Sequence, residues 1–245
     1  MIIPRLIFPR AVLGTLAACG LVACGLVACA PAGAPGGAPA SGPTPIVQAP
    51  VMQTPPDSAA IAATDSVLLR FATTRGDIDV MVRRSWAPYG APRVAEAVAA
   101  GYYDGARFFR ALRGFVVQWG IAADSAVSER WSARSIPDDT VRESNRRGTV
   151  TFAAGGANTR TVQLFVNLRD NARLDALRFA PVGEVVRGMD VVDALYTEYG
   201  EAAPAGKGPS QGRIGAQGEA YLARDFPLLD QIRTARVVRL YPAAR

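Results

Sequence analysis

Two segments of the chain combine the pattern of a buried β-strand with polar side chains that a protein core does not need. Residues 108–120 read FFRALRGFVVQWG, and residues 148–167 read GTVTFAAGGANTRTVQLFVN. Arg110 and Gln118 interrupt the first apolar pattern, and Gln163 interrupts the second. Arginine carries a permanent charge and a rigid fork of donors. Such a cation beside aromatic residues on a strand indicates a site on the face of a sheet or barrel.

From Ser66 onward, short strand-like runs predominate. Val67, Leu69 and Phe71 alternate with other residues as a strand does, and a hairpin follows through residues 77–83. Further runs lie near residues 105–112, 115–120, 147–153, 163–168, 180–187 and 235–240.

Helical patterns are few. They cover residues 91–100 and 189–199, with a short third helix within 221–232 and a glycine-rich loop over 201–218. Domains with many strands and few helices usually close into a barrel, because closure removes exposed edges. The expected fold is mainly β: a closed eight-stranded antiparallel barrel capped by two main helices, spanning residues 66–241.

The N-terminus, residues 1–29, has the pattern of an export signal. Two arginines within the first ten residues precede an uninterrupted run of small and apolar residues, 11–28. Three near-repeats inside the signal end at Cys19, Cys24 and Cys29, and each resembles the lipobox of bacterial lipoproteins. Cys29 is the preferred acylation site because the apolar run stops there. Cys24 is the alternative acylation site. A further alternative is an ordinary secretory signal in which the cysteines have no role.

Residues 30–65 are rich in Pro, Ala, Gly and Ser, which predicts a disordered tether. Beyond Cys29 the chain has no cysteine, and it has no histidine at all. Catalytic triads, metal sites and general bases that depend on histidine are therefore excluded. The net charge of +6 comes without long basic blocks, which argues against a nucleic-acid partner. Asp138, Asp139 and Glu143 lie in a polar stretch and are expected to face solvent.

The two polar-interrupted segments resemble a known family. Residues 108–120 are similar to the cyclophilin motif F-H-R-V-I-P-G-F-M-x-Q-G-G, and residues 148–167 are similar to G-x-x-S-M-A…N-x-x-x-S-Q-F-F-I. The resemblance extends over about residues 66–240. It implies an eight-stranded antiparallel barrel with two capping helices and the activity of a peptidyl-prolyl cis-trans isomerase.

The resemblance also assigns residues to roles. Arg110 matches the catalytic arginine, and Gln118 and Gln163 match the glutamines that orient it and bind the substrate backbone. The remaining substrate-binding positions are Phe115, Val116, Ala153, Ala154, Phe165, Leu174 and Phe179. Any one of these residues alone could be an ordinary core or surface residue. Their joint spacing favours a site.

Four positions depart from the family pattern. Phe179 replaces the pocket histidine, and Arg173 stands where relatives carry the tryptophan that contacts cyclosporin. Trp119 stands where many relatives have glycine, and Arg113 replaces a proline. Phe179 keeps the pocket apolar, so we expect catalysis to survive. Substrate preference and inhibitor binding are the properties that these changes affect.

The implied reaction needs no cofactor or metal. Rotation about an X-Pro bond faces a barrier of about 18–20 kcal/mol from amide resonance. A donor aimed at the prolyl nitrogen stabilises the twisted transition state, since that nitrogen gains a lone pair.

We therefore expect an exported, lipid-anchored isomerase that acts on proline-containing segments of unfolded or flexible proteins. It would face the periplasm or the cell exterior. Two alternatives are a catalytically weak module that binds proline-containing partners and a purely structural envelope lipoprotein.

Overall fold

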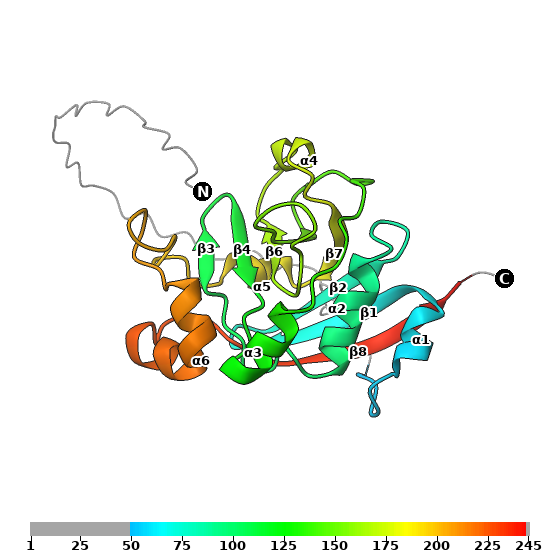
Figure 1. Ribbon diagram of the computed structural model, residues 1–245, viewed down its shortest axis with the longest axis horizontal. Helices are drawn as coiled ribbons and strands as arrows, with labels where there is room; N and C mark the ends of the chain where they lie inside the picture. The colour runs from blue at the N-terminus through cyan, green and yellow to red at the C-terminus, as the bar shows by residue number, and fades with distance from the viewer. Residues whose placement is uncertain (1–49, 244–245) are drawn as a thin grey trace, which may run out of the picture. The chain divides into compact units, whose positions relative to one another are not determined.

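The structure is a computed structural model and describes residues 50–243. The expected signal segment, Cys29 and the first part of the expected tether lie outside these residues. Eight strands form one antiparallel sheet in the order β3-β4-β6-β5-β7-β2-β1-β8 (Figure 1). The strands are β1 Thr64–Thr73, β2 Asp77–Arg83, β3 Arg110–Leu112, β4 Val116–Trp119, β5 Thr149–Phe152, β6 Leu164–Asn167, β7 Pro181–Arg187 and β8 Ile232–Pro242.

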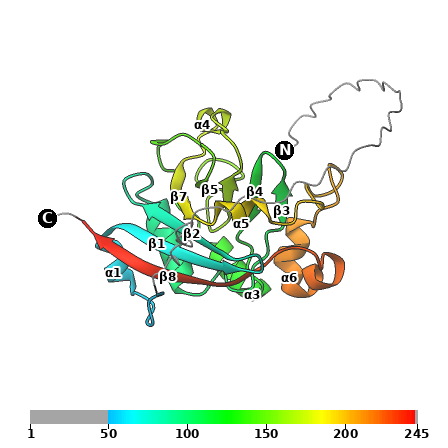
Figure 2. The ribbon, with the colours of Figure 1, turned by 180° about the vertical axis from the view of Figure 1, so that it is seen from behind.

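Six helices accompany the sheet in the described part of the chain. They are α1 Ser58–Ala62, α2 Gly90–Ala99, α3 Ser125–Ser132, α4 Arg173–Ala176, α5 Met189–Asp193 and α6 Gln211–Asp225. Helix α2 packs against β1, β2 and β8 (Figure 1), whereas α3 packs against α6, which lies below β3 in Figures 1 and 2. Within residues 50–243, none of the helices combines the length and hydropathy that crossing a bilayer requires.

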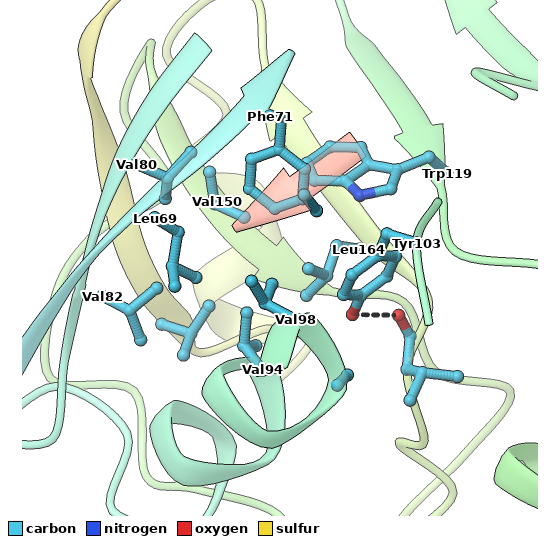
Figure 3. Close-up of a cluster of buried hydrophobic side chains, with 14 of the residues drawn as sticks. Leu69, Phe71, Val80, Val82, Val94, Val98, Tyr103, Trp119, Val150 and Leu164 are labelled. Atoms are coloured by element: carbon cyan, nitrogen blue, oxygen red, sulfur yellow. Dashed lines mark hydrogen bonds between the residues drawn. The ribbon is translucent and has the colours of Figure 1, made fainter. Parts of the chain in front are cut away.

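The core is built from the alternating apolar residues that the sequence singles out. Val67, Leu69 and Phe71 of β1 stand opposite Val82, Val80 and Ile78 of β2. Their side chains point to one face because successive residues of a strand alternate in direction. Helix α2 covers this face with Val94 and Val98, as Figure 3 shows. The predicted helix over residues 91–100 is thereby confirmed.

The expectation of a closed barrel is wrong for this structure. Strands β3 and β8 are the two ends of the sheet and do not pair along their lengths. They approach only where an isolated bridge joins Arg107 to Gln231, beside backbone bonds from Phe108 to Asp230 and from Ile232 to Ala106. The run expected as a strand over residues 105–112 begins in a turn. Only three residues remain for β3, too few to continue the ladder to the long strand β8.

The helices also differ from the expectation after residue 189. Helix α5 ends at Asp193, so the expected helix over residues 189–199 is shorter than predicted. The expected loop over residues 201–218 instead contains the first half of α6. Its glycines hid a helical pattern in which Ile214, Tyr221 and Leu222 pack in a small second core. Gly218 interrupts the helix with φ 58°, and a Cβ there would meet the Ala123 carbonyl oxygen at 2.3 Å.

The ordered domain begins before Ser66. Asp57 caps α1 by accepting a hydrogen bond from the Ala60 amide, and Ile61 of this helix is buried in the main core. Further upstream, the Met52 amide donates to the Val237 carbonyl oxygen at 2.9 Å. The last part of the segment expected as a tether therefore packs against the sheet.

Asp139, expected at the surface, is buried and organises the start of α2. Its carboxylate accepts hydrogen bonds from the amides of Tyr89 and Gly90, both at 2.9 Å. It also pairs with the buried guanidinium of Arg160 at 3.0 Å. A buried helix start needs acceptors for its free amides, and the carboxylate supplies them.

We expect Asp139→Ala to be strongly destabilising. The change would leave the Arg160 cation buried without this partner, and losing one member of a buried pair costs about 3–5 kcal/mol. Asp193→Ala is the matched control, because the Asp193–Arg147 pair is nearly half exposed and should cost at most about 1 kcal/mol. Urea unfolding monitored by circular dichroism measures both. Equal losses for the two variants would contradict the role given to Asp139.

Candidate active site

Four neighbouring strands present two different rows of side chains on their two faces. Toward the main core the strands β3, β4, β6 and β5 place Ala111, Val117, Val166 and Val150. The adjacent row, on the opposite face, consists of Arg110, Gln118, Phe165 and Thr151. Sheet alternation thus sends an apolar row inward and places the polar residues of the sequence motif together on the other face.

The polar residues of this second row form a connected chain. Nη1 of Arg110 donates to Oε1 of Gln118 at 3.2 Å, and Nε2 of Gln118 donates to Oε1 of Gln163 at 2.9 Å. Arg110 and Gln118 are cross-strand partners, so their contact follows from the register of the β3–β4 hairpin. The structure therefore brings together the three polar residues that the sequence predicted for the site.

Arg110 has a second partner, which the sequence analysis missed. Nε of Arg110 donates to Oε2 of Glu201 at 2.8 Å, and Nη2 lies 2.7 Å from the same oxygen in an ion pair. Burial alone would raise the pKa of Glu201. The hydrogen bond and charge of Arg110, with the Ala202 amide, instead hold that pKa below its ordinary value. Glu201 is 91 residues from Arg110 in sequence, and no pattern in its glycine-rich surroundings signals the pairing.

An apolar cluster lies on the same face of the sheet. Val116, Phe165 and Leu174 are buried there, and Phe115, Ala153 and Phe179 pack against them partly exposed. The rings of Phe165 and Phe179 meet edge to face with centroids 5.8 Å apart. This cluster is separate from the main core. A partly open apolar surface beside convergent polar groups is typical of a small binding site.

The structure places nearly all predicted substrate-binding residues in this region. Six of them make up the apolar cluster itself, and Gln118 and Gln163 form the polar chain beside it. Ala154 is half-buried next to Ala153 and lies outside the cluster. The Ala153 amide donates to the Gln163 carbonyl oxygen at 2.9 Å, which fixes the end of β5 against β6.

The buried side-chain amide of Asn145 connects two segments that line the pocket. Nδ2 of Asn145 donates to the carboxylate of Asp175 and to the carbonyl oxygen of Phe179, both at 2.7 Å. Its Oδ1 accepts from the Thr151 hydroxyl at 2.9 Å. Asn145 thus ties the segment that carries Leu174 and Phe179 to strand β5. Partial burial raises the pKa of Asp175, but hydrogen bonds from Ser144 and Asn145 outweigh this and lower it.

Comparison with known proteins decides the family. Residues 68–211 match the family model described as cyclophilin type peptidyl-prolyl cis-trans isomerase/CLD. The chain belongs to the cyclophilin family. Peptidyl-prolyl cis-trans isomerase A of Dickeya dadantii is 32% identical over 145 residues, which is 56% of this chain and 75% of that protein. A peptidyl-prolyl cis-trans isomerase of Acinetobacter baylyi is 30% identical over 136 residues, 53% of this chain and 72% of that protein.

A solved structure supports the fold. The Cryptosporidium parvum cyclophilin type peptidyl-prolyl cis-trans isomerase superposes with a TM-score of 0.53 at 18% identity. The match covers 70% of this chain and 97% of that one. Within residues 50–243, no group of three or more Asp, Glu, Cys or His side chains could hold a metal ion.

Three of the positions that depart from the cyclophilin pattern lie in different environments. Trp119 is buried in the main core, where its indole meets Phe71 and Phe108 edge to face (Figure 3). Arg113 is exposed and pairs with Glu198 at 2.7 Å. Arg173 lies at the pocket, with its guanidinium carbon 4.8 Å from the centre of the Phe115 ring. Of these three, only Arg173 changes the surface that a ligand of the apolar cluster would meet.

We expect this cyclophilin to bind cyclosporin weakly and Arg173→Trp to bind it at least about tenfold more tightly. The arginine covers the Phe115 ring with a hydrated cation, whereas tryptophan offers a large apolar face and an N–H donor. Isothermal titration calorimetry on both proteins checks this. Equally tight binding by the unchanged protein would mean that Arg173 does not occupy the tryptophan position.

Proposed function

We propose that this cyclophilin is a peptidyl-prolyl cis-trans isomerase that acts without a cofactor on proline-containing segments of exported proteins. The observation that carries the proposal is the position of Arg110 relative to the apolar cluster. Arg110 pairs with Gln118, and Gln118 pairs in turn with Phe165 on the next strand. Two strand spacings separate Arg110 from Phe165, about 10 Å between Cα atoms. A proline seated on the cluster would lie within reach of the long arginine side chain.

The geometry supports a mechanism based on positioning and electrostatics. The proline ring packs against Phe115, Phe165 and the neighbouring apolar side chains, which anchors one side of the rotating bond. The Gln163 side chain is available to the backbone of the flanking residues. Arg110 donates a hydrogen bond to the prolyl nitrogen as the amide twists, which favours the transition state over the planar ground state. No bond is made or broken, so no nucleophile or proton carrier is needed.

A second function, binding of proline-containing partners with little catalysis, is favoured by one observation. Glu201 already contacts two nitrogens of Arg110, accepting a hydrogen bond from Nε and forming an ion pair with Nη2. If a substrate had to displace this carboxylate, the arginine would contribute little to the transition state. Measured rates of isomerisation, set against peptide affinity, separate the two functions.

We expect Arg110→Ala to lower kcat/KM for an X-Pro peptide by about 10²-fold or more, the usual effect of removing a donor aimed at developing charge. Arg113→Ala is the matched control. Its side chain is 78% exposed and, within residues 50–243, pairs only with groups of residues 197–198, so the variant should keep the full rate. A protease-coupled isomerisation assay measures both rates, with circular dichroism confirming that each variant folds. A folded Arg110→Ala variant with undiminished activity would refute the assigned role.

We further propose that Cys29 is acylated and that the protein is held at a bacterial membrane, facing the periplasm or the cell exterior. The lipobox-like repeats, the preceding apolar run and the absence of later cysteines support this. Stable anchoring requires more than one acyl chain, and bacterial lipoproteins carry several. A membrane location would place the isomerase where exported chains fold.

The protein should sediment with membranes and be released by detergent but not by high salt, because acyl chains are held by the hydrophobic effect rather than by charge. Cys29→Ser should move most of the protein to the soluble fraction, unless Cys24 or Cys19 is used instead. Mass spectrometry of the wild-type N-terminus identifies the acylated residue. A variant lacking all three cysteines that still sediments with membranes, together with an unacylated wild type, would contradict the proposal.

A further inference from the structure

We propose that Glu201 is a positioning residue that orients the guanidinium of Arg110 for catalysis, an inference that rests on the isomerase function proposed above. The carboxylate comes from the loop between α5 and α6, and the arginine from β3 at the end of the sheet. This loop lies beside β3 in both ribbon views (Figures 1 and 2). The match of the site to the cyclophilin motif does not include Glu201.

The contacts with Glu201 and Gln118 use only part of the donor capacity of the guanidinium. Arginine has five N–H donors in a planar fork. Glu201 accepts a hydrogen bond from Nε and forms an ion pair with Nη2, and Gln118 accepts a hydrogen bond from Nη1. Each terminal nitrogen therefore retains one N–H that these two partners do not use. Both remaining donors lie in the plane that the two partners fix.

Backbone contacts within the loop between α5 and α6 hold the Glu201 carboxylate in place. Oε1 of Glu201 accepts from the Ala202 amide at 3.0 Å, and the Gly208 amide donates to the Glu201 carbonyl oxygen at 2.7 Å. A parallel bridge joins Ala202 to Gly208. A Cβ on Gly206 would meet the Glu201 carbonyl oxygen at 2.3 Å, and one on Gly208 would meet it at 2.9 Å. Only residues without a side chain allow the loop to close this tightly around Glu201.

The charge of the pair is suited to orientation rather than to proton transfer. Arginine stays protonated at all relevant pH values, and Arg110 holds the neighbouring carboxylate in its ionised form. A charge-assisted hydrogen bond is shorter and stronger than a neutral one. Because the pair is about one quarter to one third exposed, water can reach it. The ion pair therefore restricts the arginine rotamers while leaving the terminal N–H groups accessible.

The opposite role would be competition, in which Glu201 blocks Arg110 until a substrate displaces it. The two roles predict opposite effects of removing the carboxylate. If Glu201 positions Arg110, Glu201→Ala lowers kcat, because the arginine must be ordered in the transition state. If Glu201 competes, the same variant raises kcat/KM. Removing an interaction that acts in the transition state alone lowers kcat with little change in KM.

The experiment compares Glu201→Ala, Glu201→Gln and the control Glu198→Ala in the protease-coupled assay. We expect Glu201→Ala to lower kcat about tenfold with KM changed less than about twofold. Glu201→Gln keeps the length and one acceptor oxygen, so it should recover part of the loss. Glu198 belongs to the same loop but pairs with the exposed Arg113, so Glu198→Ala should retain the wild-type rate. An unchanged or increased rate for Glu201→Ala would overturn the proposal.

A double variant tests whether Glu201 acts through Arg110. In an Arg110→Ala background, adding Glu201→Ala should lower the rate by less than about twofold, since the group to be positioned is absent. A further tenfold loss would overturn the proposal, because Glu201 would then act on the substrate or on the fold.

A direct readout of the arginine separates this inference from the proposed function. In the NMR spectrum of the wild type, Nε–H of Arg110 should give a distinct signal in slow exchange with water. The signal should be lost in Glu201→Ala and retained in Glu198→Ala. If the wild type has no isomerase activity, the proposed function fails, and this spectrum still reports whether Glu201 orders Arg110. A signal that is unchanged in Glu201→Ala would overturn the positioning role.

Discussion

The site depends on the strict alternation of side chains across β3, β4, β6 and β5. Ala111, Val117 and Val166 must enter the main core, so their neighbours Arg110, Gln118 and Phe165 must face the other way. A slip of one residue in register would bury the arginine and expose the core row. The free energy of burying the apolar row therefore sets the geometry of the polar row.

The remaining parts of the site come from segments that are distant in sequence and are tied to this platform by polar contacts. Asn145, fully buried, connects the segment carrying Phe179 to β5. Glu201 connects the loop before α6 to β3. A buried amide is costly unless its hydrogen bonds are made, so Asn145 has few alternative positions. Together these contacts keep an apolar pocket and a charged donor at fixed distance.

The sequence was sufficient to predict the platform because its signals are local. The resemblance to the cyclophilin motif assigned Arg110, Phe115, Gln118, Gln163 and Phe165 to one site. Side-chain alternation and strand register then put Gln118 and Phe165 on the same sheet face. Closure of the barrel was predicted wrongly, because strand-like composition near residue 105 concealed a turn and left β3 only three residues long. Glu201 and Asn145 were missed because their roles arise from contacts between distant segments, which single-sequence patterns do not encode. The first half of helix α6 was missed because its glycines outweighed the spacing of its apolar residues, whereas its end, residues 221–225, falls within the predicted third helix.

The most direct test of the account is exchange NMR on a short X-Pro peptide in the presence of the purified protein. Free peptide interconverts over tens of seconds or longer, so it gives no exchange cross-peaks at mixing times below one second. The account predicts cis–trans exchange cross-peaks when a small fraction of protein is added. Peptide signals that shift on binding, yet show no cis–trans exchange, would contradict it and leave a proline-binding module in place of an isomerase.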